Sequence, residues 1–200
     1  NTTGCNNIAI GCFAMINATT ARNNIAQGYQ ALYGLTCGNG NIAQGYQALK
    51  CNSIGNSNVA TGFKSLTSNT TGKNNIAIGD IAMCKNTIGQ DNIAIGIASM
   101  LCNTTGNQNI ALGCFALKCN SIGDCNIAIG RCSGCAISTG RNNTIIGTLI
   151  GTAGMQCTLL LGAGTCERVK VDNSGLYING SAYTPAVTTD FTPMLLLGGM

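Results

Sequence analysis

A motif of the form Asn-x-Ile-Ala-Ile-Gly recurs every 17 residues, without insertions, along most of the chain. Its first apolar residue is Ile8, Ile25, Ile42, Val59, Ile76, Ile93, Ile110 and Ile127. Its closing glycine is Gly11, Gly28, Gly45, Gly62, Gly79, Gly96, Gly113, Gly130 and Gly147. A fixed repeat of this kind indicates a solenoid, in which each repeat packs only against its neighbours.

The repeat is too short for the helical solenoids. A repeat of two helices needs about 33 residues, and a leucine-rich repeat at least about 20. Gly, Asn, Thr and Ile are also poor helix formers. Each unit instead has the pattern of a strand, a glycine turn, a short Ala-Leu or Ala-Met stretch, and an Asn-Thr-Thr-Gly turn. We therefore predict an all-β fold, a parallel β-solenoid (β-roll or β-helix) of 17-residue coils over residues 1–154.

Glycine and asparagine recur at the predicted corners of this solenoid. We attribute the glycines, including a second row from Gly38 to Gly140, to backbone with positive φ, which glycine adopts without steric cost. An asparagine precedes each strand, from Asn7 to Asn143. Stacked asparagine side chains can form amide ladders along a solenoid, and we expect such ladders here.

The middle of each predicted strand is alanine in eight successive repeats. In Ile-Ala-Ile the isoleucines point to one face of the strand and the alanine to the other. A face made only of alanine indicates close approach, either by the opposite wall of a flat coil or by another chain. We favour another chain. This places the isoleucine row in the repeat core and makes an inter-chain or close-packed face of Ala26, Ala43, Ala60, Ala77, Ala94 and Ala111.

Composition argues against several classes of function. The chain has no histidine, which removes histidine-based acid–base catalysis and histidine metal ligands. The six acidic residues are scattered over different phases of the repeat, so we expect no enzymatic activity and no cofactor. The net charge of +4 is thinly spread, which predicts no nucleic-acid partner. No apolar run is long enough to predict a membrane span.

Thirteen cysteines are an odd number, so intramolecular disulfides cannot pair all of them. Several fall at equal or adjacent phases of neighbouring repeats. They are candidates for at least one disulfide, within or between chains: Cys84, Cys102, Cys114, Cys119, Cys132 and Cys135. The alternative is that they are small buried apolar residues. Cys119, Cys125, Cys132 and Cys135 lack the two close pairs of a zinc site, so we expect no metal.

The repeats resemble those of known fibres. The segments 41–49 (NIAQGYQAL) and 69–79 (NTTGKNNIAIG) are similar to the head repeats of trimeric autotransporter adhesins and to fibre proteins of tailed phages and large viruses. The resemblance covers about residues 1–154. It implies left-handed coils assembled as a homotrimer, at a virion surface or outside the cell. It also implies contacts with other virion proteins and with a host-surface glycan or receptor.

The chain changes character after Gly154. Val169 and Val171 alternate with polar residues, a turn follows at 172–175, and Leu176 and Ile178 alternate again. This pattern predicts a β-hairpin within a C-terminal cap segment over 155–200. The pattern also resembles segments found in viral fibres just ahead of a trimerisation or self-cleaving chaperone domain. We expect the apolar residues 191–200 to pack as a cap or to join a further element.

The sequence favours a structural fibre or spike protein of a virion that acts in host attachment. A bacterial surface adhesin head is an alternative. Ice binding is a third candidate, because one row of hydroxyl residues runs from Thr2 to Ser138. The candidate ligand row is aromatic and consists of Tyr29, Tyr46 and Phe63, with Gln30, Gln47 and Lys64 beside it. Gln27, Gln44 and Thr61 predict a hydrated belt or a side-chain ladder.

Overall fold

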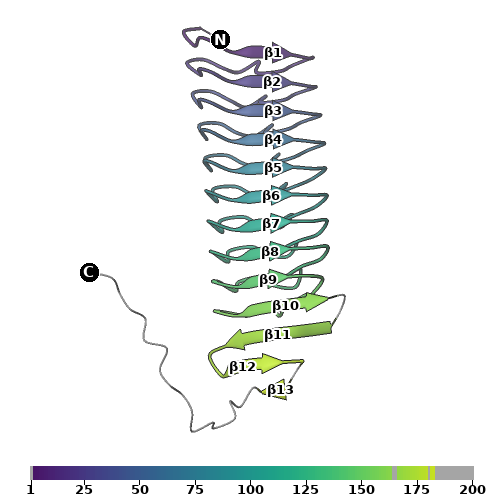
Figure 1. The fold of residues 1–200 in the computed structure, drawn as a ribbon. Helices are drawn as coiled ribbons and strands as arrows, with labels where there is room; N and C mark the ends of the chain where they lie inside the picture. Colours follow the sequence, from purple (N-terminus) through teal and green to yellow (C-terminus); the bar gives the residue numbers. More distant parts are fainter. Residues whose placement is uncertain (1, 164–165, 180, 183–200) are drawn as a thin grey trace, which may run out of the picture.

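The computed structural model describes residues 2–163, 166–179 and 181–182, which form thirteen β-strands and no helix. All the strands belong to one sheet, in which they follow one another in sequence order (Figure 1). The strands are β1 (Ile8–Ile10), β2 (Ile25–Gln27), β3 (Ile42–Gln44), β4 (Val59–Thr61), β5 (Ile76–Ile78), β6 (Ile93–Ile95), β7 (Ile110–Leu112), β8 (Ile127–Ile129), β9 (Thr144–Ile146), β10 (Leu159–Ala163), β11 (Cys166–Asp172), β12 (Gly175–Ile178) and β13 (Ser181–Ala182).

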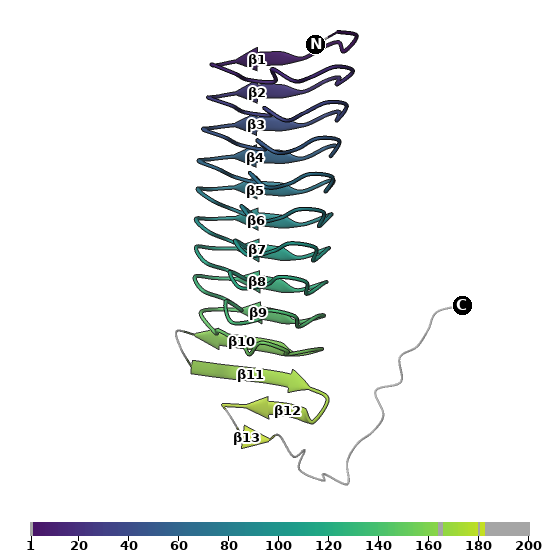
Figure 2. The same cartoon turned by 180° about the vertical axis from the view of Figure 1, so that it is seen from behind.

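Strands β1 to β10 form a parallel stack with one strand per coil (Figures 1 and 2). From β1 to β9 every residue pairs with the residue 17 positions later, as in Ile76 with Ile93. The last coil is two residues shorter, since Thr144 pairs with Leu159. The predicted parallel β-solenoid of 17-residue coils is confirmed. Its stack continues past the predicted boundary at residue 154.

The sheet changes direction after β10. Strand β11 runs antiparallel to both β10 and β12, and Asp172 pairs with Gly175 across the turn. The predicted hairpin is therefore present, with Val171 opposite Leu176. Its role as a cap stays a prediction, and residues 191–200 lie outside the described part of the chain.

The alanine row lines the interior of the solenoid. We number the positions of each coil so that Ile8, Ile25 and Ile42 share position 8. Alanine at position 9 is completely buried within the single chain from Ala26 to Ala128. It faces the return segment, positions 12–17, which runs back behind the strand. The Ser65 hydroxyl at position 14 donates to the Ala77 carbonyl oxygen, at 2.9 Å across the interior.

The two predictions about these rows have different outcomes. The face formed by Ala26, Ala43, Ala60, Ala77, Ala94 and Ala111 is close-packed against the opposite wall of the coil, which was the alternative prediction; the favoured inter-chain placement is wrong, because the narrow coil closes over this face. The row of Ile8, Ile25, Ile42, Val59, Ile76, Ile93, Ile110 and Ile127 is not the core: Ile8 is exposed and the others are half-buried. Leucine and methionine at position 15 make the apolar core instead, as at Leu66 and Met83.

Asparagine side chains form two buried ladders along the stack, as predicted. At position 7, Asn75 Nδ2 donates to Asn58 Oδ1 at 3.1 Å and to the Gly89 carbonyl at 2.8 Å. The Asn75 backbone N–H donates to the same Asn58 oxygen. The second ladder, at position 1, joins Asn52, Asn69, Asn86, Asn103 and Asn120. Within the ladders each buried amide is bonded to neighbouring coils, which holds the coils in register; the exception is Asn120 Oδ1 at the end of the second ladder, which has no partner.

The two glycine rows have different causes. At position 11, from Gly11 to Gly147, φ lies between 116° and 136°, as predicted. At position 4 the glycines have no positive φ; a Cβ at Gly72 would instead overlap the Gly89 carbonyl oxygen. The attribution of both rows to backbone conformation is thus wrong for position 4, where close stacking excludes a side chain.

Candidate functional surfaces

The outer face of strands β1 to β9, which we call the strand face, is apolar and solvent-accessible. Position 10 leaves Ile78, Ile95 and Ile129 about two-fifths exposed, and position 8 adds a half-buried aliphatic row. Neither position carries a charged residue in these strands. Contiguous apolar surfaces of this kind are unusual on monomers, which makes the strand face a candidate interaction surface.

The predicted polar belt lies on this face in β2 to β4. Gln44 Nε2 donates to Gln27 Oε1 at 3.5 Å, and Thr61 follows in the next coil. The interaction is long, and both glutamines are exposed. The row is therefore a loose ladder, a polar zone in β2 to β4 that lies between the aliphatic strand β1 and the longer aliphatic zone of β5 to β9.

The candidate ligand row forms an aromatic ladder at position 12. The rings of Tyr29 and Tyr46 stack with centroids 5.3 Å apart, and those of Tyr46 and Phe63 with centroids 5.2 Å apart. Phe13 packs edge-on against Tyr29. Because neighbouring rings cover one another's faces, a ligand reaches mainly ring edges and hydroxyls. Beside the ladder, Gln47 Nε2 donates to Gln30 Oε1 at 2.8 Å.

The hydroxyl row does not offer its donors to solvent. Each hydroxyl at position 2 donates to the backbone carbonyl of the same position in the next coil, as Thr70 does to Thr87 at 3.0 Å and Thr87 to Thr104 at 3.0 Å. The same contact recurs along the row, from Thr2 to Ser121. The row binds coil to coil, which removes the observation that favoured ice binding.

All cysteines whose side chains are described are free, including Cys84, Cys102, Cys114, Cys119, Cys132 and Cys135. None of these six forms a disulfide within the chain in this structure, and a disulfide between chains stays a prediction. In-register parallel coils hold equivalent Cβ atoms about 4.8 Å apart, beyond the usual spacing in a disulfide. No cluster of potential metal ligands occurs among the described residues.

The thiols differ in acidity. Burial raises the pKa of Cys84 and of Cys135. A side-chain hydrogen bond from Thr20, with further ones from Thr36 and Thr19, lowers the pKa of the exposed Cys37 thiol.

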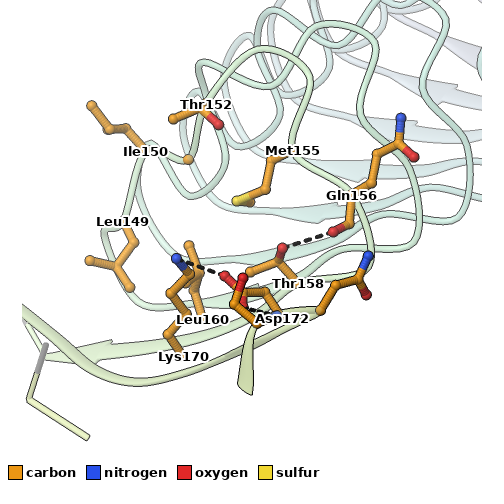
Figure 3. Close-up of a pocket in the computed structure, with 12 residues that line it drawn as sticks. Leu149, Ile150, Thr152, Met155, Gln156, Thr158, Leu160, Lys170 and Asp172 are labelled. Atoms are coloured by element: carbon orange, nitrogen blue, oxygen red, sulfur yellow. Dashed lines mark hydrogen bonds and ion pairs between the residues drawn. The ribbon is translucent and has the colours of Figure 1, made fainter. Parts of the chain in front are cut away.

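A hollow of about 550 Å³ lies where the shortened last coil meets the hairpin (Figure 3). Leu149, Met155 and Leu160 form its apolar lining, and Lys170 Nζ pairs with Asp172 at 2.8 Å. Hydrogen bonding to Lys170 lowers the pKa of the Asp172 carboxyl. The hollow thus has an apolar wall and one carboxylate that is paired with a lysine.

The coil concentrates positive charge that looks dispersed in the sequence. Lys50 and Lys118 share position 16, Lys85 occupies position 17 and Lys64 position 13. We call these four residues of the return segments the lysine wall. The sequence analysis missed it, although counting residue numbers in multiples of 17 would have revealed it.

The described part of the chain contains no helix that could cross a membrane. No protein-family model matches the chain, and no curated protein or solved structure is significantly similar to it.

Proposed function

We propose that this chain is a structural rod of a fibre or spike, assembled as a homotrimer through its strand face, that serves in attachment. The observation that carries the proposal is the apolar strand face. Covering a half-exposed isoleucine removes roughly 40 Å² of apolar surface, so the two rows offer on the order of 600 Å² per chain. In a trimer this area is divided between two neighbours, and its total per chain is comparable to the about 800 Å² that each partner buries in a typical stable complex.

Rotational symmetry suits this face. Copies arranged around an axis along the rod bring the same coils to the same level, so aliphatic rows meet aliphatic rows and glutamines meet glutamines. Such a ring closes and leaves no free copy of the interface. The resemblance of 41–49 and 69–79 to trimeric fibre repeats favours three chains.

The attachment role follows from what remains outside such an assembly. The return segments, with the aromatic ladder and the lysine wall, face away from the strands and repeat along the rod. We propose a virion surface or another extracellular site as its location. A bacterial adhesin head would use the same architecture and is the alternative.

The test is the native mass of the assembly, by light scattering with and without reductant. We expect about three times the 20.4 kDa chain mass in both conditions, since the described thiols are free. The double substitution Ile95→Glu and Ile129→Glu should yield monomers. The matched control, Ile54→Glu with Ile88→Glu, changes two isoleucines at a turn that are somewhat more exposed than Ile95 and Ile129, and should keep the trimer. A monomeric wild type, or equal dissociation of both variants, would overturn the proposal.

A further inference from the structure

The lysine wall is one surface although its members are far apart in the sequence. Backbone hydrogen bonds stack positions 16 and 17 of successive coils, as from Lys85 N to Leu101 O and from Cys102 N to Lys118 O. Lys64 and Lys85 both lie near the Cys84 thiol, whose pKa they draw downward against the larger raising effect of burial.

The charges on this wall are evenly spaced along the rod. Lys50, Lys85 and Lys118 occur in every second coil, at nearly the same position of the coil. Because stacked strands lie about 4.8 Å apart, the spacing is about 10 Å. Lys64 lies to one side, in the coil between Lys50 and Lys85.

The four lysines of the wall are not held in ion pairs with carboxylates in the described part of the chain. Asp80, the acid closest in coil position, accepts the Phe63 backbone N–H at 3.1 Å. The Lys64 and Lys118 ammonium groups lie 5.2 and 5.1 Å from the ring centroids of Phe63 and Phe115, which orients both cations.

We infer that the lysine wall binds a linear acidic polysaccharide lying along the rod. This inference rests on the proposed attachment function and names its ligand class. A spacing of about 10 Å is close to the length of one disaccharide in an extended chain, so a polymer with one carboxylate per disaccharide meets one lysine every two coils. The Gln30–Gln47 amide ladder offers donors and acceptors to sugar hydroxyls beside the charged row.

The same surface fits single-stranded nucleic acid poorly. Proteins that bind such strands stack the bases on open aromatic faces. Here Tyr46 is stacked on both faces, and Tyr29 and Phe63 are each stacked on one face. Consecutive phosphates are also spaced more closely than the lysines.

The experiment measures the affinity of the full chain for a fluorescent, size-defined hyaluronan oligosaccharide over a series of salt concentrations. The test variant is Lys50→Gln, Lys85→Gln, Lys118→Gln. The control is Arg22→Gln, Lys73→Gln, Arg141→Gln, which removes equal charge from exposed side chains that share position 5 at the turn. We expect the test variant to bind about tenfold more weakly with a shallower salt dependence, and the control to change less than about threefold.

Equal weakening by both variants, or no binding at low salt, would overturn the inference. If the chain binds an oligothymidylate more tightly than the oligosaccharide, and the test variant loses that binding, the ligand of the wall is nucleic acid and not a polysaccharide. Native mass measured on the same samples separates the two proposals. If the wild type is monomeric and only the test variant binds the oligosaccharide more weakly, the polysaccharide site is supported and the trimeric fibre is rejected. If the wild type is trimeric and both variants lose affinity equally, the fibre is supported and the polysaccharide site is rejected.

Discussion

The asparagine ladder at position 1 allows a sharp test, because the chain itself ends the ladder at Ile137. Asn86 lies within the ladder. Its Nδ2 donates to Asn69 Oδ1 at 2.8 Å, and its Oδ1 accepts from Asn103 Nδ2 at 2.7 Å. Asn120 lies at the end, where its Oδ1 is buried without a partner.

Leucine at the two sites should have very different effects. Asn86→Leu leaves Asn69 Oδ1 without a donor and Asn103 Nδ2 with one bond fewer, both buried. At about 1–3 kcal/mol for each unsatisfied group, partly offset by the apolar side chain, the net cost is about 2–4 kcal/mol. Asn120→Leu leaves Asn103 Oδ1 unpaired but removes an oxygen that was already unpaired, so the cost is within about 1 kcal/mol.

The two substitutions are matched in chemistry and shape, and Leu35 shows that this row accepts leucine with complete burial. Equilibrium unfolding in guanidinium, followed by circular dichroism, measures the difference in the free energy of unfolding. Equal destabilisation by both variants would refute the reasoning, since it would mean that hydrogen-bond count in the ladder does not determine stability.

Three further predictions concern stacking, core volume and thiol acidity. Gly72→Ala should cost about 3 kcal/mol of unfolding free energy, measured in guanidinium, because its Cβ would overlap the carbonyl of the next coil; a cost below about 1 kcal/mol would contradict this. Ala94→Ile should cost about 1–3 kcal/mol by overfilling the interior, and adding Met83→Gly should restore part of it in a double-mutant cycle; additive losses would be the contrary result. Mass spectrometry after brief iodoacetamide treatment near neutral pH should show Cys37 modified faster than Cys84, because the Cys37 pKa is lowered and the Cys84 pKa raised; the reverse order would contradict it.

The prediction for Ala94→Ile with Met83→Gly follows from a pair of compensating residues that the chain already contains. Ile145 replaces alanine at position 9, and its Cδ1 lies 3.3 Å from where a Cβ on Gly134 would be. Gly134 occupies position 15, where other coils have leucine or methionine. A large residue on one wall is thus compensated by a small one on the other, and the sequence holds both changes eleven residues apart.

The repeat alone predicted the fold, the register and the asparagine ladders, because a 17-residue period leaves one way to stack the coils. Other features, such as the backbone conformation of the core residues, depend on distances between backbone segments that the sequence pattern does not specify. Leucine and methionine at position 15 adopt φ between 48° and 51°, a region usually avoided by such residues. Nothing in their type signals this conformation; burial of their side chains in the core imposes it.

The orientation of the strand shows why the candidate interface was assigned to the wrong face. Alternation in Ile-Ala-Ile separates two faces but does not say which one lies inside, and larger apolar residues usually fill a core. Here the return segment passes so close that only alanine fits, which turns the isoleucines outward. The inversion moves the proposed assembly surface from alanine to isoleucine. It also explains how a chain with 45% hydrophobic residues can have an interior lined largely by alanine and still leave large apolar side chains exposed for partners.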